Sequence, residues 1–425
     1  MAAPRDLRVA IVGGGIGGLT AALCLQKYGI AAELLEAAQE VRPLGVGINV
    51  QANSVRVLQQ LGLFDELDAS GIRTAELRFA NRHGQMIWAD PRGIDAGLPW
   101  PQLSIHRGEL QMVLWRAAVA RLGQQRLLTG ARLVDFDDTA DGRLRLVLQD
   151  HAGRPAGEKV ADILVGADGI HSAVRAKLYP GEGAPKWNGV LMWRGVTEAA
   201  PFLGGRSMVQ AGHRRQKFVC YPISRRHAER GGALINWIAD VYQDGATAPR
   251  REDWNRQGNV ADFLPRYRDW NFGWIDVPRI ISGAKAVYEF PMVDRDPLPR
   301  WTHGRVTLLG DAAHPTYPIG SNGASQAILD GEAIAQALAG TSDPQEALAV
   351  YERTRRPITT QFVEANRRQG IDRMLDIVEE RAPGGFATLE SVLPAAELES
   401  IVAEYKRFAA NDRETLLRLA AAQRS

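Results

Sequence analysis

Apolar positions near the start of the chain change from one periodicity to another. Leu7–Val12 is a short, mostly apolar run rich in β-branched residues and followed at once by glycines, which predicts a buried parallel strand. From Gly15 to Tyr28 apolar residues recur at helical spacing, and Gly29 suits a helix end. Ala32–Glu36 predicts a second strand. The chain therefore opens with a β-α-β unit of about 30 residues.

The same patterns recur further along. An amphipathic helix is predicted over Ser104–Leu122 and another helix over Ala324–Ala339. Short apolar runs predict strands, and these are Leu127–Phe136, Leu144–Leu148, Ile163–Val165 and Val306–Leu309. Strands typical of the first unit thus occur both near the start and near residue 306, so we expect its domain to be discontinuous.

Residues 186–301 differ in composition and apolar pattern from the preceding segments, and they hold 7 of the 10 tryptophans. Alternating apolar runs such as Lys217–Pro222 and Gly232–Ile238 predict an antiparallel sheet, and hence a second domain. The rest of the chain reads as mostly helical, with a break at Pro383.

These patterns predict an α/β fold: a discontinuous Rossmann-like domain, a second domain built on an antiparallel sheet and a helical C-terminal tail. We assign 1–75, 104–185 and 291–345 to the first domain and 186–290 to the second. Residues 76–103 are an excursion into the second domain, and 346–425 form the helical C-terminal region.

Composition narrows the function classes. With 51 basic and 49 acidic residues the net charge is +2, which gives no reason to expect a nucleic-acid or membrane partner. Cys24 and Cys220 are far apart, so we expect no disulfide and a reducing cytoplasm. The sequence contains neither a secretory signal nor an apolar run long enough to span a membrane. No metal site is predicted, and the oligomeric state is left open.

The glycines after the first strand form a dinucleotide-binding fingerprint. Gly13, Gly15 and Gly18 satisfy Gly-x-Gly-x-x-Gly between a strand and a helix, and a second strand ends on the acid Glu36. Gly13 allows the tight turn, Gly18 the packing of helix on strand, and the amides of Gly15 and Ile16 at the helix start suit a pyrophosphate. Glu36 suits ribose hydroxyls. This fingerprint does not separate FAD from NAD.

Two later motifs do separate them. Ile163–Arg175 is a strand, a turn and a helix start containing Asp168-Gly, and Leu308–Pro315 is a strand ending on Gly310-Asp311. With the fingerprint, these segments resemble, in order and spacing, the motifs of the flavoprotein aromatic hydroxylases, the family of p-hydroxybenzoate and salicylate hydroxylases. The resemblance implies FAD as cofactor.

A closer resemblance is to the members of that family that hydroxylate methylphenazine carboxylates. It rests on segments such as Ser104–Met112, Met192–Glu198 and Gly320–Asp330, and covers most of the chain to about residue 360. In those relatives hydroxylation replaces a ring carboxylate. The resemblance leaves open whether this chain does the same.

The family resemblance also predicts which other residues contact the cofactor. It implies that Asp311 binds the ribityl or ribose part of FAD and that Arg107 approaches the pyrophosphate, with a solvated helix arginine as the alternative. Val46 and Val134 would touch FAD through backbone atoms. Asp168 would organise the turn near the pyrophosphate together with Arg175, which could equally be a solvated helix residue.

Pro318–Gly323 leads into the helix predicted from Ala324. In the family such a loop lies against the flavin pyrimidine edge, where a helix N-terminus stabilises the negative charge of reduced flavin. We therefore expect Gly320, Asn322 and Gly323 to contact FAD, an ordinary glycine-rich helix start being the alternative.

The implied reaction uses NADH or NADPH to reduce the flavin and O2 to form a C4a-hydroperoxyflavin. The distal oxygen is then transferred to a small aromatic or heteroaromatic, carboxylated substrate in a closed pocket. Candidate bases are Tyr221, His314 and Tyr317, each with a structural alternative. Arg194 either pairs with a substrate carboxylate or forms a structural ion pair.

Other classes remain to be excluded. Flavin halogenases need Trp-x-Trp-x-Ile-Pro, and glutathione-reductase-type enzymes need a close cysteine pair; both are absent. A related FAD oxidoreductase, a flavin-binding redox sensor without turnover and a flavin-free dehydrogenase stay as alternatives. The sequence does not distinguish NADH from NADPH.

Overall fold

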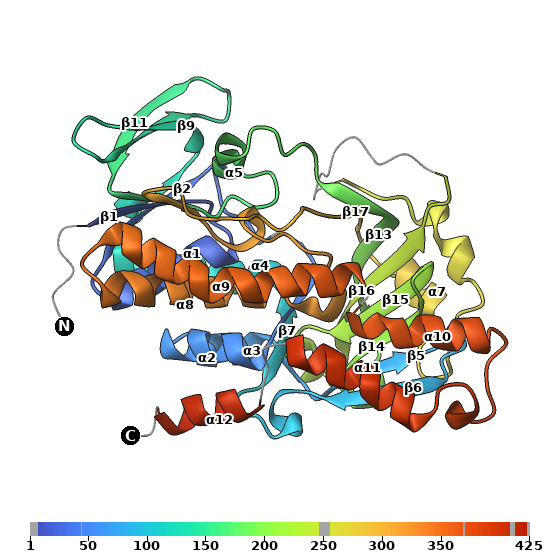
Figure 1. The fold of residues 1–425 in the computed structure, drawn as a ribbon. Coiled ribbons are helices and arrows are strands. Elements are labelled where there is room, and N and C mark those ends of the chain that lie inside the picture. Colours follow the sequence, from blue (N-terminus) through green and yellow to red (C-terminus); the bar gives the residue numbers. More distant parts are fainter. Residues whose placement is uncertain (1–6, 44, 246–255, 369, 409–412, 423–425) are drawn as a thin grey trace.

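The computed structural model describes residues 7–43, 45–245, 256–368, 370–408 and 413–422, and two sheets organise them (Figure 1). The first is a five-stranded parallel sheet in the order β18-β12-β1-β2-β8. Its strands are β1 (Arg8–Val12), β2 (Ala31–Glu36), β8 (Leu127–Thr129), β12 (Ile163–Gly166) and β18 (Val306–Leu308). Because β18 pairs with β12, the first sheet draws on both ends of the chain, and the predicted Rossmann-like fold is confirmed.

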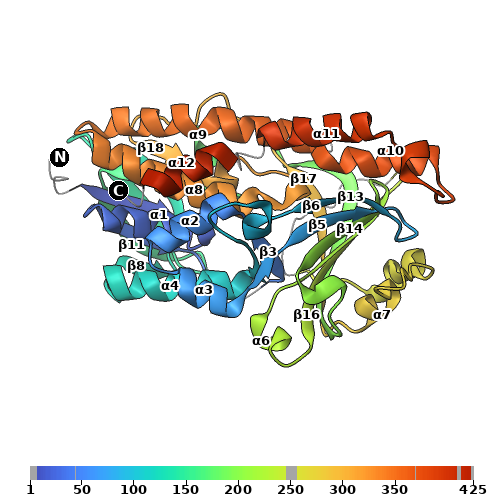
Figure 2. The same ribbon diagram turned by 90° about the horizontal axis from the view of Figure 1, so that it is seen from below.

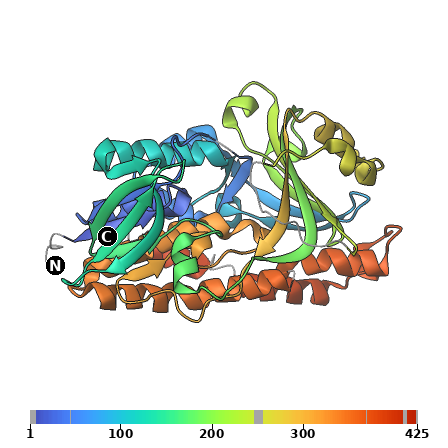
Figure 3. The same cartoon turned by 90° about the horizontal axis from the view of Figure 1, so that it is seen from above.

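Helices cover this sheet on both sides. Helix α4 (Arg107–Leu122) and helix α9 (Pro344–Arg367), teal and orange in Figure 3, lie on opposite sides of it. Helix α1 (Ile16–Lys27) packs against α8 (Gly323–Gly340), and α8 packs against α9. The smaller helices are α2 (Ala52–Gln60), α3 (Phe64–Ser70) and α5 (Ala173–Leu178).

The second sheet has seven strands in the order β17-β13-β16-β15-β14-β5-β6, with only the β14–β5 pair parallel. Its strands are β5 (Glu76–Ala80), β6 (Met86–Pro91), β13 (Lys186–Ala199), β14 (Ser207–His213), β15 (Gln216–Pro222), β16 (Ala233–Tyr242) and β17 (Val287–Asp294). Helix α10 (Arg373–Arg381) lies on one side and α7 (Val277–Ser282) on the other (Figure 2). The excursion proposed for 76–103 thus supplies two strands, and β17 continues past residue 290.

Two three-stranded sheets complete the fold. Strands β3 (Gly47–Val50), β7 (Gln102–His106) and β4 (Ile72–Thr74) pair in that order, and so do β11 (Pro155–Ala161), β10 (Leu144–Gln149) and β9 (Arg132–Asp138). The C-terminal tail is helical, as predicted, with α11 (Ala395–Phe408) and α12 (Arg413–Ala422) following the break at Pro383.

Two predicted elements were wrong in detail. Ser104–His106 is strand rather than helix, because these residues pair with β3 and β4 and are largely buried. The strand predicted over Leu127–Phe136 is split, because Gly130 takes a left-handed backbone conformation (φ 66°) and turns the chain.

Two further observations bear on the class of protein, one on its cysteines and one on its helices. Cys24 and Cys220 are both free and buried. Within the described parts of the chain, no helix has the length and apolar character needed to cross a membrane.

Candidate active site

The glycines before α1 shape a cradle for an anion. A Cβ on Gly13 would lie 2.3 Å from the carbonyl oxygen of Ala167, and one on Gly18 would lie 2.1 Å from that of Gly13. At Gly15, by contrast, a Cβ would meet nothing within 4 Å. The first helical bond runs from the Leu19 amide to the Gly15 carbonyl, so the amides before Leu19 have no intrahelical partner. The helix therefore presents free amides to open space, which is the geometry of a phosphate site.

Glu36 lies in the same corner, at the end of β2. Its carboxylate accepts the Gly14 amide at 2.6 Å and the Ala38 amide at 2.7 Å. Each carboxylate oxygen retains a further lone pair, so ribose hydroxyls can still donate to it. Gln111 of α4 donates to the Gly14 carbonyl at 2.8 Å and holds the turn from the other side, a contact that the sequence did not indicate.

Arg107 and Asp311 are both accessible to water in the structure, yet both are desolvated by the protein around them. Burial lowers the pKa of Arg107 and raises the pKa of Asp311, and the two charges partly oppose these shifts. Both side chains are therefore available to a ligand. The Arg107 amide donates to the Val46 carbonyl at 2.9 Å, so Val46 lies next to Arg107.

Asp168 caps the turn beside the cradle. One carboxylate oxygen accepts the Ala173 amide at 2.7 Å, while Oδ1 is buried with no hydrogen-bond partner among the described residues. The Asp168 Cα lies 3.1 Å from the Cβ position of Gly13. Burial raises the pKa of Asp168. An unpartnered buried oxygen next to the glycine turn is consistent with a ligand at this point.

The contacts of Arg175 match neither role that the sequence suggested, a residue that organises the turn near the pyrophosphate or a solvated helix residue. It is almost fully buried, pairs with Glu182 and donates to the carbonyls of Ala312 and Ala313 at 3.0 and 3.1 Å. It is therefore not solvated, and its donors are directed to the segment around Asp311 rather than to the cradle.

Val134 lies on β9 with an exposed side chain. The pairing of β9 with β10 shifts register there, since Val147 pairs with Asp135 and Leu148 with Leu133, which leaves Val134 unpaired on that side. Its backbone is thus free for other contacts, and its role against FAD stays a prediction.

Hydrogen bonds fix the loop before α8, whereas the start of α8 faces open space. Ser321 adopts a left-handed conformation (φ 55°), and its hydroxyl accepts from Asn49 at 3.5 Å. The Gln51 amide donates to Ser325 at 2.9 Å. A Cβ on Gly323 would meet nothing within 4 Å, whereas Asn322 is buried. A second helix N-terminus therefore opens onto free space, as the predicted flavin contact of Gly320–Gly323 requires.

A buried charge network underlies this loop. Asp330 of α8 accepts from His314 at 2.6 Å, Arg355 at 2.7 Å and the Gly310 amide at 3.1 Å. Burial alone would raise the pKa of Asp330, but the charges and hydrogen bonds of His314 and Arg355 lower the pKa to about 2. His314 also packs against Trp301, with ring centroids 5.3 Å apart. These contacts favour an anchoring role for His314.

Replacing Asp330 with Asn is expected to destabilise the protein by about 3–5 kcal/mol, because Arg355 would remain buried without its counter-ion. The pKa of Asp330 lies below its unfolded value, so its contribution is present above about pH 4 and is lost as the pH falls towards 2. Urea unfolding measures both effects. Glu346→Gln, which removes an exposed partner of Arg353, is the matched control and should cost at most about 1 kcal/mol. Equal losses for the two variants would contradict the buried network.

The seven-stranded sheet contributes a second polar cluster. Tyr221 of β15 and Asn236 of β16 are register partners. Asn236 accepts the Gly47 amide at 2.6 Å, and Arg194 of β13 donates to the Gly47 carbonyl at 3.1 Å. These bonds attach β3, and with it Val46, to the seven-stranded sheet. Arg194 also hydrogen-bonds the Tyr221 hydroxyl, and burial raises the pKa of Tyr221 to about 12.

Several polar atoms on this sheet face have no partner within the described chain: Arg194 Nε, Gln210 Oε1, Asn236 Nδ2 and Asp240 Oδ1. By strand alternation they share a face with the apolar cluster that contains Met192, Val219, Phe290, Tyr317 and Ile319. Buried polar atoms are normally hydrogen-bonded, so this face is suited to a ligand with polar groups. The sequence analysis missed Gln210, Asn236 and Asp240.

Of the four catalytic candidates, Arg194, Tyr221 and Tyr317 meet at this face, while His314 lies in the network with Asp330. Tyr317 hydrogen-bonds Asp294, and burial raises the pKa of Tyr317 to about 12. Both tyrosines therefore stay protonated near neutral pH and can donate hydrogen bonds. The catalytic roles of the four candidates stay predictions.

Comparisons with known proteins show which family and which individual enzymes this chain is similar to in sequence. A family model described as FAD binding domain matches residues 6–366. The chain is 47% identical over 401 residues to the phenazine 1,6-dicarboxylic acid hydroxylase PhzS of Lysobacter antibioticus, covering 94% of this chain and 96% of the relative. It is 32% identical over 372 residues to the 3-amino-4-hydroxybenzoate 2-monooxygenase of Streptomyces cremeus, covering 86% and 87%.

Solved structures share the fold. Klebsiella pneumoniae HpxO complexed with FAD and uric acid superposes with a TM-score of 0.73 at 22% identity, covering 97% of each chain. A salicylate hydroxylase substrate complex superposes with a TM-score of 0.72 at 23% identity, covering 99% of this chain and 98% of the other.

Proposed function

Because this chain belongs to the FAD-binding family of flavin-dependent aromatic hydroxylases, we propose that its substrate is a planar heteroaromatic carboxylate of the phenazine type, held through its carboxylate by Arg194. The predicted class, an enzyme that uses FAD, NAD(P)H and O2 on a small aromatic substrate, is confirmed by these relatives. The redox-sensor alternative is correspondingly disfavoured.

The substrate proposal rests on the burial and the hydrogen-bond partners of Arg194. Its guanidinium is desolvated, which lowers its pKa, and Nε is buried without a partner among the described residues. No carboxylate hydrogen-bonds it within the described chain; its partners are the Gly47 carbonyl and the Tyr221 hydroxyl. Asp240 acts on Arg194 only through its charge, so a carboxylate on the substrate would supply a hydrogen-bonded counter-ion and accept from Nε.

The residues around the cradle fit FAD. The open helix start at Gly15, the acid Glu36 and the desolvated pair Arg107 and Asp311 would hold the dinucleotide, and the α8 N-terminus would face the flavin ring. When bound, FAD reduced by NAD(P)H would activate O2, so that one oxygen atom enters the aromatic ring and the other leaves as water.

The chain's own residues position the ring and exclude water. Arg194 fixes the carboxylate end of the substrate, and Tyr221 donates a hydrogen bond, since its hydroxyl stays protonated. The apolar side chains of Met192, Val219 and Phe290 enclose the ring and keep water from the reacting atoms. Gln210 Oε1 and Asp240 Oδ1 remain for polar groups elsewhere on the substrate.

Oxidation of NADH and NADPH should be followed with phenazine mono- and dicarboxylates, with monocyclic hydroxybenzoates and with phenazine itself, which lacks a carboxylate. The proposal expects the phenazine carboxylates to accelerate oxidation most and phenazine least. Mass spectrometry of the product then shows whether one oxygen is added or replaces a carboxylate. A hydroxybenzoate as the best substrate would overturn the phenazine assignment but not the family.

A further inference from the structure

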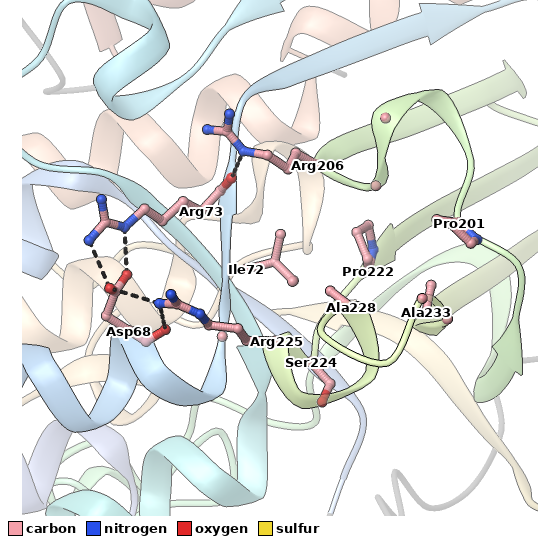
Figure 4. A pocket seen from close by; sticks show the side chains of 15 residues that line it. Asp68, Ile72, Arg73, Pro201, Arg206, Pro222, Ser224, Arg225, Ala228 and Ala233 are labelled. Atoms are coloured by element: carbon pink, nitrogen blue, oxygen red, sulfur yellow. Dashed lines mark hydrogen bonds and ion pairs between the residues drawn. The ribbon is translucent and has the colours of Figure 1, made fainter.

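A cavity of about 580 Å³ opens between the two domains, away from the site described above. Its walls come from α3 and β4 on one side and from the loop before β14 (201–206) and α6 (Arg225–Ala228) on the other (Figure 4). Its volume is that of a small-molecule site. None of its lining residues belongs to the FAD cradle or to the Arg194 face.

The cavity has a charged end and an apolar end. Figure 4 shows Arg73, Arg206 and Arg225 gathered at one end, whereas Pro201 and Pro222 lie at the other. The three arginine side chains are 46–49% exposed, so their donors are accessible to a ligand.

The three arginines are ion-paired but keep accessible N–H donors. Arg73 holds Asp68 in two hydrogen bonds of 2.6 and 2.7 Å, and Arg225 reaches the same carboxylate at 3.3 Å. Arg225 also pairs with Glu229 at 3.3 Å, so the carboxylates Asp68, Asp95 and Glu229 balance the three guanidinium charges. A guanidinium group has five N–H donors, and these ion pairs do not occupy all of them. Arg206 donates to the Arg73 carbonyl at 2.9 Å and pairs with Asp95 at 2.7 Å. Clustered, accessible guanidinium groups are suited to an anion with several oxygens, such as a pyrophosphate.

The position of the cavity relates it to the flavin. Ile72 and Arg73 lie on β4, which pairs with β7, and β7 pairs with β3, whose first residue is Gly47. Two strand spacings separate β4 from β3 by about 10 Å. Pro222, on the apolar wall, directly follows Tyr221 on β15. The cavity thus lies about two strand spacings from β3, whose residue Gly47 contacts Arg194.

We propose that this cavity binds the pyrophosphate of NAD(P)H and directs the nicotinamide towards the flavin. The proposal rests on the hydroxylase function, which consumes NAD(P)H. Arg206 and Arg225 bind the phosphate oxygens, and the apolar wall packs against the uncharged part of the dinucleotide.

Two variants test the site without leaving a buried charge. Arg206→Gln leaves Asp95, which is 38% exposed, without its arginine. Arg225→Gln leaves Asp68 paired with Arg73 and removes the partner of Glu229, which is 66% exposed. Arg116→Gln is the matched control. It removes one exposed arginine, paired with Glu66, from the same part of the molecule, outside the cavity lining.

Each cavity variant is expected to raise the Kd of NADH or NADPH by about tenfold or more, because it loses a charge-assisted hydrogen bond to the phosphate. Anaerobic flavin reduction at increasing NADH or NADPH concentration measures this Kd. Reduction by N-benzyl-1,4-dihydronicotinamide, which has no phosphate, should be unchanged, as should the Kd of the aromatic substrate. Calorimetry should show ADP-ribose binding to wild type and to Arg116→Gln, weakened in both cavity variants.

Unchanged Kd values for NAD(P)H and ADP-ribose in both cavity variants would overturn the proposal. A rise in the Kd of the aromatic substrate alone would also overturn it, because the cavity would then hold an aromatic acid. Failure of the wild-type, FAD-loaded protein to oxidise either nicotinamide would instead refute the hydroxylase function on which the proposal rests.

Discussion

Replacing Arg194 with methionine is expected to lower kcat/KM for a carboxylated substrate by roughly 30-fold to several thousand-fold. The range corresponds to about 2–5 kcal/mol for removing one partner of a buried, hydrogen-bonded charge pair. Arg194 is desolvated, with Nε unpartnered among the described residues, so a substrate carboxylate would be its counter-ion. Steady-state kinetics with matched carboxylated and carboxylate-free analogues measures the effect.

Two controls separate substrate binding from structure. Arg194→Lys keeps the charge but not the planar donor pair, so it should recover part of the loss for the carboxylated analogue. Arg194 also donates to the Gly47 carbonyl, so FAD content and thermal stability must be compared with wild type. An equal loss for both analogues would contradict the role of Arg194 as the carboxylate contact.

Substituting Gly15 with valine is expected to weaken FAD binding by about 10- to 100-fold, equivalent to roughly 1.4–2.7 kcal/mol, while leaving the apoprotein as stable as wild type to within about 0.5 kcal/mol. The backbone at Gly15 is in an ordinary extended conformation (φ −76°), and nothing lies within 4 Å of its Cβ position. A side chain there meets open space in the protein but would meet the pyrophosphate when FAD binds. Fluorescence titration of the apoprotein with FAD gives the Kd.

Gly13→Ala is the contrasting variant. Gly13 has a φ of 109°, and its Cβ would lie 2.3 Å from the Ala167 carbonyl oxygen, so this change should destabilise the apoprotein itself by more than about 2 kcal/mol. If Gly15→Val binds FAD as tightly as wild type, the pyrophosphate does not lie at the start of α1.

The parts of the site that sequence could predict are those encoded locally. The glycine turn, Glu36 at the end of the next strand and the loop before α8 are strand–turn–helix units in which neighbours in sequence are neighbours in space. The same locality explains why a β-α-β reading of the first 36 residues was sufficient to predict the Rossmann-like domain, whose fold is confirmed.

The missed residues depend on strand pairing. Asn236 and Gln210 look like ordinary polar positions in buried strands, and only register brings Asn236 beside Tyr221 and against Gly47, 189 residues away. Ser104–His106 was misassigned for a related reason, since pairing with β3 and β4 overrides the helical pattern that continues after it. The arginine cavity likewise joins segments that are distant in sequence, so composition gave no sign of it.

The most direct test of the central claim is turnover of a phenazine carboxylate with NAD(P)H under ¹⁸O₂, with the product followed by mass spectrometry. The account predicts one ¹⁸O atom in each hydroxylated product, formed by the FAD-loaded protein and lost in Arg194→Met. Oxidation of NAD(P)H with no labelled product from any aromatic acid tested would contradict it.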